Sequence, residues 1–147
     1  MDFDTEVKTA IYRRVAETTK VPSAAELAGA LGVVPDEVRA AYRRLLDRRV
    51  LFLEPDGETI RMAPPFSGVP TQHRVCVGDR TYFANCSWDS LGIPAALHAE
   101  ADVFSRCEQT LEPIHLRIRR DGPEDPNPVV AHFAVPAAKW WADLVYT

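Results

Sequence analysis

The first third of the chain has a helical pattern of hydrophobic positions. Apolar residues recur every three or four positions with polar residues between them, which is typical of amphipathic helices that pack on one core. Ser23 and Glu26 have the spacing of a capping box, so a helix is expected to begin at Ser23, and Gly32 is expected to end it. The pattern therefore predicts three helices: residues 5–19, residues 23–32 and a third after a break at 35–36.

A change of period follows these helices. Residues 50–53 and 59–62 are short runs of strand-forming side chains on either side of a turn at 56–57, so they indicate a β-hairpin. Three helices followed by a hairpin, in this order, predict a winged helix-turn-helix domain over residues 1–65.

The remainder of the chain follows a stretch rich in proline and glycine, residues 63–70, where we expect a domain boundary. Alternating patterns and short apolar runs predict that residues 71–147 form a second domain, with an α+β fold built on a mixed sheet. Its strands are expected at 74–78, 81–84, 101–107, 114–119 and 129–135, its helices at 90–97 and 137–144, and a loop at 121–128.

Length and composition limit the class of protein. The chain has 147 residues, 46% of them hydrophobic, and a net charge of −4, so no global positive field attracts nucleic acid or an anionic membrane. No apolar run approaches the roughly 20 residues of a membrane span, and the acidic start lacks the features of a signal peptide. Three cysteines without a repeating spacing indicate free thiols. We therefore expect a cytoplasmic protein with no membrane partner.

The third expected helix carries several arginines outside its apolar stripe, among them Arg39, Arg43 and Arg44. Such side chains are what a helix-turn-helix reader uses on phosphates and base edges. However, residues 1–65 hold ten basic and eleven acidic side chains, so this part has little positive charge to offer to DNA. DNA binding and a purely structural role both remain open, and the second is favoured.

The pattern with the most chemical content is a thiol and a carboxylate three residues apart, Cys86 and Asp89, at the expected start of a short helix. Residues at this spacing share one helix face, so both groups can reach one bound atom. The helix dipole is expected to favour the thiolate of Cys86. Asn85 and Trp88 flank the pair and are candidates for shaping a pocket. The other interpretation is that Cys86 is structural and Asp89 only caps the helix or is exposed.

The segment around this pair resembles the alkylmercury (organomercurial) lyase family. Residues 82–95 are similar to the family's first active-site segment, in which an aromatic strand leads to Cys-x-x-Asp and then to a Pro-Ala helix. Residues 101–107 are similar to the following strand, whose cysteine, Cys107 here, is usually regarded as structural. Residues 140–143 resemble a later Trp-containing helix, and a winged-helix-like N-terminal domain is part of the same plan. The resemblance covers nearly the whole chain.

The resemblance implies a reaction in which a carbon–mercury bond is broken by a proton. Cys86 would be the attacking ligand, because mercury is a soft metal that prefers thiolate, and Asp89 would pass the thiol proton to the departing carbon. The substrate would be an organomercurial, the products a hydrocarbon and bound Hg(II), and cytosolic thiols would accept the metal. No organic cofactor is expected.

The resemblance also implies a second catalytic thiol that helps to hold mercury. The other cysteines are Cys107, a weak candidate ligand, and Cys76, and both are more readily interpreted as buried packing. Two further functions therefore stay open. One is a winged-helix regulator that senses a thiol-reactive metal or ligand through Cys86, and the other is a family relative that has no lyase activity.

Overall fold

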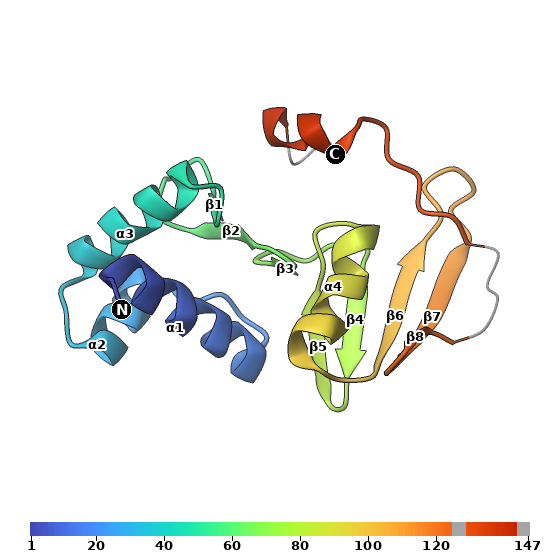
Figure 1. Ribbon diagram of the computed structural model, residues 1–147, viewed down its shortest axis with the longest axis horizontal. Helices are drawn as coiled ribbons and strands as arrows, with labels where there is room; N and C mark the ends of the chain where they lie inside the picture. Colours follow the sequence, from blue (N-terminus) through green and yellow to red (C-terminus); the bar gives the residue numbers. More distant parts are fainter. Residues whose placement is uncertain (125–128, 144–147) are drawn as a thin grey trace.

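The computed structural model describes residues 1–124 and 129–143, which form an α+β fold (Figure 1). The chain begins with three helices: α1 (Phe3–Thr18), α2 (Ala24–Leu31) and α3 (Pro35–Asp47). The capping box is confirmed, because the backbone of Glu26 donates to the hydroxyl of Ser23 and the backbone of Ser23 donates to the Glu26 carboxylate. Pro35 stands in the first turn of α3, where its missing N–H costs nothing, so it begins the helix and does not break it.

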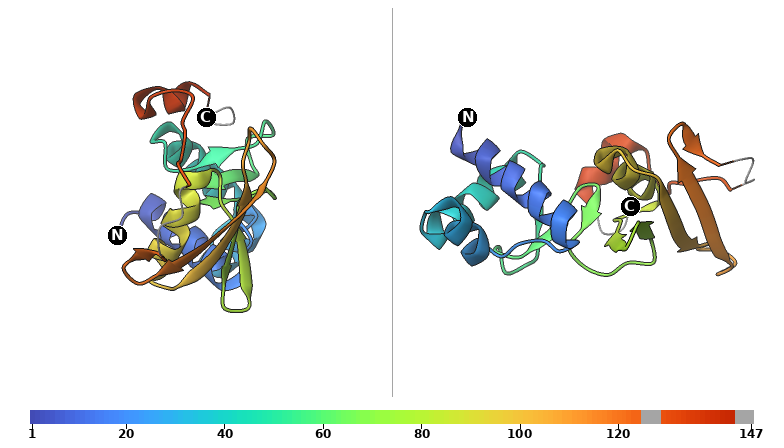
Figure 2. Two further views of the ribbon diagram at one scale, coloured as in Figure 1. Left: turned by 90° about the vertical axis from the view of Figure 1, so that its right-hand side faces the viewer. Right: turned by 90° about the horizontal axis from the view of Figure 1, so that it is seen from below.

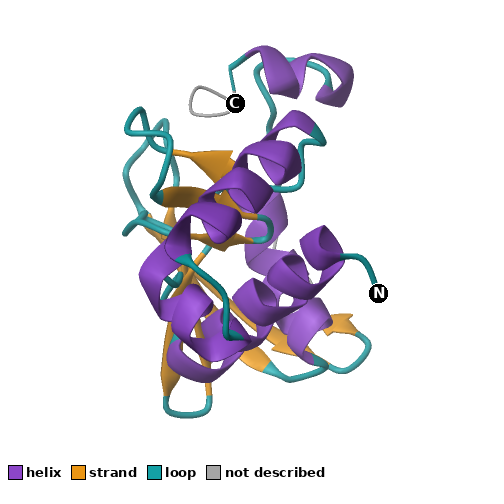
Figure 3. Ribbon diagram, turned by 90° about the vertical axis from the view of Figure 1, so that its left-hand side faces the viewer, coloured by secondary structure: helices purple, strands orange, loops and turns teal. Residues whose placement is uncertain are grey.

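The expected hairpin is present as part of a three-stranded antiparallel sheet in the order β1-β2-β3. Its strands are β1 (Phe52–Leu53), β2 (Ile60–Ala63) and β3 (Phe66–Ser67). The last of these falls inside the proline-rich stretch, where the sequence predicted only a connection. The three helices lie together beside this sheet (Figure 3).

The second half of the molecule is a five-stranded sheet in the order β5-β4-β6-β7-β8, in which every pairing is antiparallel. The expectation of a mixed sheet is therefore wrong for the described residues. Helix α4 (Ser87–Leu97) packs on β4 and β6 and covers one face. The strands are β4 (Arg74–Val77), β5 (Arg80–Phe83), β6 (Ala101–Arg106), β7 (Pro113–Arg119) and β8 (Gly122–Pro123).

The two halves lie side by side and share buried residues where they meet (Figure 2). The ring of Phe66 on β3 lies 6.3 Å from that of Tyr12 on α1 and 5.5 Å from that of Tyr82 on β5, measured between centroids. The Tyr82 hydroxyl donates to the backbone carbonyl of Ala16 at 2.6 Å. One continuous apolar core therefore runs from α1 to the five-stranded sheet.

The C-terminal part differs most from the sequence prediction. Residues 129–135 are not a strand, and residues 137–142 form a 3-10 helix, η1 (Ala137–Ala142), where a helix over 137–144 was expected. Parts of the predicted loop at 121–128 and of that helix lie outside the described residues. No helix among the described residues is long and apolar enough to cross a membrane.

Candidate thiol and carboxylate site

Cys86 stands at the junction between strand β5 and helix α4. The strand is followed by Ala84, whose N–H donates to the carbonyl of His73 at 2.9 Å and whose carbonyl accepts a hydrogen bond from Thr71 at 2.6 Å. These bonds fix the backbone just before Cys86, which then acts as the N-cap residue of α4 in an extended conformation. The thiol is therefore placed at the first turn of the helix, as the sequence predicted.

Asp89 lies in the same first turn and is partly buried. The side-chain amide of Asn85 donates to its Oδ2 at 2.9 Å. Burial raises the pKa of Asp89, and the hydrogen bond from Asn85 lowers it by a smaller amount. A carboxyl group with a raised pKa binds a proton more readily than an ordinary aspartate.

The Cys86 thiol is not activated as the sequence predicted. Burial raises its pKa, and the negative charge of Asp89 adds to that effect. The backbone N–H groups of Asp89 and Trp88 act in the opposite direction but do not outweigh it. The N-terminus of the helix thus favours the thiolate as expected, but burial outweighs it, so the expected net activation of Cys86 is wrong.

Asn85 and Trp88, the two flanking candidates, are used differently. Asn85 is directly hydrogen-bonded to Asp89, whereas the Trp88 side chain is 63% exposed. Trp88 forms one wall of an open apolar pocket of about 690 Å³, whose other aromatic walls are Phe133 and Trp140. The Trp140 ring lies 4.9 Å from that of Phe133, so this pocket is made by the C-terminal segment that the sequence predicted as strand and helix.

The other two cysteines are free thiols that lie outside helix α4. Cys107 is half-buried in the turn after β6, and hydrogen bonds from Thr110 lower the pKa of its thiol. Cys76 is half-buried, with its Sγ 3.6 Å from the hydroxyl of Thr81. The expectation that both would be buried packing is wrong. Within residues 1–124 and 129–143 no group of three or more histidine, cysteine and acidic side chains is placed to hold a metal ion.

The arginines of α3 are largely committed to carboxylates of the same chain. Arg39 pairs with Asp36 at 2.6 Å and with Glu58 at 3.1 Å. Arg44 binds the buried carboxylate of Asp4, with its Nη2 at 2.6 Å and its Nε at 2.9 Å from Oδ1. Of the three arginines considered for DNA, Arg43 and Arg44 are exposed and Arg39 is half-buried.

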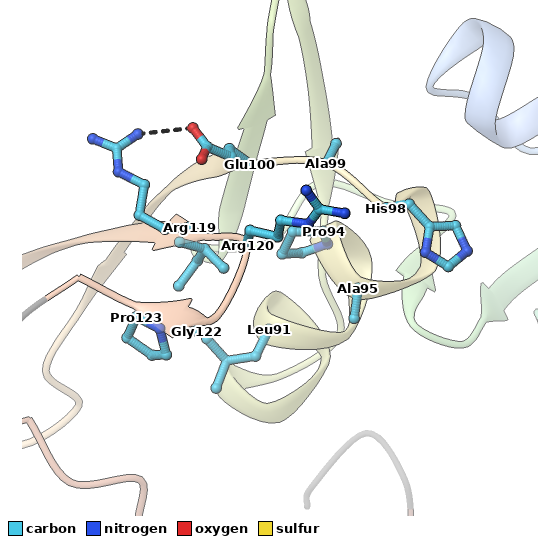
Figure 4. A pocket seen from close by; sticks show the side chains of 11 residues that line it. Leu91, Pro94, Ala95, His98, Ala99, Glu100, Arg119, Arg120, Gly122 and Pro123 are labelled. Carbon is cyan, nitrogen blue, oxygen red and sulfur yellow. Dashed lines mark hydrogen bonds and ion pairs between the residues drawn. The ribbon is translucent and has the colours of Figure 1, made fainter.

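A second cavity is lined by Leu91, Pro94 and Ala95 of α4 and by residues of β7 and β8 (Figure 4). It has a volume of about 640 Å³ and an apolar floor that includes Leu91, Pro94 and Pro123. Arg119 at its rim is paired with Glu100 at 3.2 Å. Neither Cys86 nor Asp89 lines it, so it is separate from the candidate site.

Sequence reasoning missed the residues that support Asn85. Its amide nitrogen also lies 3.3 Å from the carbonyl oxygens of Pro65 and Phe66, and the hydroxyl of Tyr12 donates to the carbonyl of Pro64 at 2.8 Å. No local pattern could have pointed to them, because Tyr12 is 52 positions from Pro64 and the other acceptors are backbone atoms.

Known proteins resemble this arrangement in sequence and in fold. A family model described as alkylmercury lyase matches residues 66–147. A solved structure described as the mercury-bound form of MerB2 has a TM-score of 0.68 and 26% sequence identity, over 87% of this chain and 61% of that one. This chain thus spans less than two thirds of that neighbour's length, and no curated protein matches it. The family match covers more than half of the sequence, including Cys86 and Asp89, and the chain belongs to the alkylmercury lyase family.

Proposed function

We propose that this protein breaks the carbon–mercury bond of organomercurials by protonolysis, with Cys86 as the metal ligand and Asp89 as the proton carrier. The observation that carries the proposal is the position of Asp89 beside Cys86, where burial raises the pKa of the carboxyl. The hydrogen-bond donor of this carboxyl is a neutral amide, that of Asn85. Membership of the family and the similarity to a mercury-bound structure support the same chemistry.

The reaction begins with loss of the thiol proton. Asp89 accepts this proton as the Cys86 sulfur forms a bond to mercury, because mercury binds thiolate and not thiol. The proton then passes from Asp89 to the carbon that is bound to mercury. The carbon–mercury bond breaks and a carbon–hydrogen bond forms, so the hydrocarbon leaves and Hg(II) remains on the sulfur. No electron donor and no organic cofactor are needed.

Release of the metal requires another soft ligand. Cytosolic thiols are the proposed acceptors, since thiolate exchange on mercury keeps the metal in its preferred ligand environment. This proposal includes a cytoplasmic location. Cys107 is the weaker alternative for a second protein ligand. It follows strand β6, whereas Cys86 follows β5, and β4 lies between these two strands in the sheet.

The N-terminal part is proposed to be a winged helix-turn-helix unit that serves as a scaffold. The pairing of Arg39 and Arg44 with acidic side chains removes cations that a DNA reader would need. The regulator alternative predicts salt-dependent binding to a specific DNA site that mercury alters and that Arg43→Ala weakens. A gel-shift titration at two salt concentrations tests it.

The lyase proposal is tested by supplying phenylmercury with excess thiol and measuring benzene by gas chromatography. Cys86→Ser should abolish release, whereas Cys76→Ser, which removes a thiol outside the site, should leave the rate unchanged. If the wild-type protein releases no benzene or methane from phenylmercury or methylmercury, the chain is a family relative without lyase activity and the proposal is wrong.

A further inference from the structure

We propose that Tyr12, on the first helix of the N-terminal unit, is a positioning residue for Asp89 and acts through residues 64–66 and Asn85. This inference rests on the proposed function for its consequence in catalysis. It places a residue of the supposed scaffold in control of the proton carrier, although the two are 77 positions apart in the sequence.

The connection is a chain of hydrogen bonds. Tyr12 donates from its hydroxyl to the carbonyl oxygen of Pro64 at 2.8 Å. The next two carbonyl oxygens, those of Pro65 and Phe66, each lie 3.3 Å from the amide nitrogen of Asn85. That nitrogen donates to Asp89 at 2.9 Å. The position of residues 64–66 therefore decides where the Asn85 amide lies and how it meets the carboxylate.

Asn85 has no other anchor for its amide in the described part of the chain. Its Oδ1 is buried and no donor among those residues reaches it. A side-chain amide is normally held from both its nitrogen and its oxygen. Here the nitrogen alone fixes its orientation, so displacement of the two backbone acceptors would leave the amide free to turn away from Asp89.

Packing holds residues 64–66 between α1 and α4. The Phe66 side chain is only 3% exposed and its ring lies against that of Tyr12. On the other side, a Cβ built on Gly92 of α4 would lie 3.1 Å from the Cβ of Pro65, so the helix backbone and the proline are in close contact. A shift at Pro64 would therefore be transmitted to α4 instead of being absorbed by empty space.

The pKa of Tyr12 also indicates that this residue lies near Asp89. Burial raises the pKa of the Tyr12 phenol, and the negative charge of Asp89 raises it further. The charge of Asp89 thus raises the pKa of both the Cys86 thiol, at the N-cap of α4, and the Tyr12 phenol on α1. The charge of the Asp89 carboxylate affects the Tyr12 phenol, but the hydroxyl donates its hydrogen bond to the Pro64 carbonyl. Tyr12 therefore acts on Asp89 through structure and not by proton transfer.

The test compares Tyr12→Phe with Tyr42→Phe. Tyr42 is a matched control, because its hydroxyl also donates to a proline carbonyl, that of Pro22, at 3.2 Å, within the N-terminal unit. The carboxyl carbon of Asp89 is titrated by ¹³C NMR, with Asp89→Asn to assign the signal. Tyr12→Phe should raise the pKa of Asp89, because a weakened bond from Asn85 removes an effect that lowers it. Tyr42→Phe should leave that titration unchanged.

The route through Asn85 is tested by a double mutant. Asn85→Ala should raise the pKa of Asp89 more than Tyr12→Phe does, and Tyr12→Phe should have no further effect in the Asn85→Ala protein. Equal shifts in the two tyrosine variants, no shift in either, or additive shifts in the double mutant would each overturn the inference. The readout needs no lyase activity, so it stands apart from failure of the proposed function.

Where the protein is active, the same variants separate positioning from binding. Tyr12→Phe should lower kcat about fivefold, the effect of one neutral hydrogen bond, and leave KM nearly unchanged. Tyr42→Phe should change neither constant. A lowered kcat with an unshifted Asp89 titration would contradict a positioning role.

Discussion

Asp4 and Asp89 each lie in the first turn of a helix, and they differ in the charge of their hydrogen-bond donors. Asp4 on α1 is buried against two guanidinium groups, those of Arg44 at 2.6 Å and Arg48 at 3.3 Å. Asp89 on α4 is partly buried, and its hydrogen-bond donor is the neutral amide of Asn85. The pKa of Asp4 is lowered, mainly by the hydrogen bonds from Arg44, whereas burial raises the pKa of Asp89.

The difference shows how the surroundings of an aspartate in the first turn of a helix suit it to a structural or a chemical role. A guanidinium beside a buried carboxylate keeps it ionised and ties two helices together, here α1 and α3. A carboxylate with only a neutral donor keeps a tendency to bind protons, at some cost to the stability of the fold. The first arrangement suits a scaffold and the second suits a proton carrier.

The largest effect is expected for Asp89→Asn. If Asp89 carries the proton, kcat for hydrocarbon release should fall by roughly 100-fold to 10,000-fold, the range for a general acid or base. The fold should be as stable at pH 7 as that of the wild type or more stable, because the amide has no charge to bury. Gas chromatography and urea unfolding measure the two. A normal rate in Asp89→Asn would make the two aspartates functionally alike.

The reciprocal change, Asp4→Asn, should have the opposite profile. It removes charged hydrogen bonds between α1 and α3 and should lower the free energy of unfolding by roughly 2 kcal/mol. The activity per folded molecule should stay unchanged, because Asp4 lies away from the candidate site. Urea unfolding together with the lyase assay tests this, and a loss of kcat at full folding would place Asp4 in the site after all.

The pH dependence of stability should separate the two carboxylates by sign. The pKa of Asp4 is lowered in the folded state, so its contribution is present above the unfolded value of about 3.9 and is lost as the pH falls through the folded value. The pKa of Asp89 is raised, so the native state loses stability as the pH rises from about 3.9 through the folded value. Urea midpoints from pH 3 to pH 8 should show Asp4→Asn approaching the wild type at low pH and Asp89→Asn gaining on it at high pH.

The smallest effect is expected for Arg48→Ala. Its ion pair with Asp4 is the longer of the two, and its side chain is 60% exposed, so solvent screens the interaction. The free energy of unfolding should fall by less than about 1 kcal/mol. A loss as large as that in Asp4→Asn would mean that Arg48, and not Arg44, is the main partner.

The elements of the N-terminal half could be predicted because their signals are local. A capping box at Ser23, a helix-ending Gly32 and a turn at 56–57 each act within a few residues. Strand β3 could not be predicted, since its two residues pair with β2 and carry no period of their own. Residues 129–135 look like a strand in sequence but have no partner strand in the described structure, and pairing is what makes a strand.

The candidate site was likewise predictable only in its local features. The spacing of Cys86 and Asp89 placed both groups in one helical turn, and the adjacent Asn85 was a candidate because of its position. The predicted direction of the Cys86 pKa shift was wrong, because burial raises this pKa. Burial depends on what packs over the helix, and the sequence shows only the helix itself. Tyr12 and residues 64–66 were missed for the same reason.

The sequence by itself determined the local elements, the pairing of a thiol with a carboxylate and, through a longer motif, the resemblance to the family to which the chain belongs. Only the tertiary structure decided which aspartate is neutralised by arginine and which is not, how deeply Cys86 is buried, and that α1 contacts the segment supporting Asn85. The physical reason is that caps, turns and motif spacing depend on neighbours in the chain, whereas burial and ion pairing depend on neighbours in space.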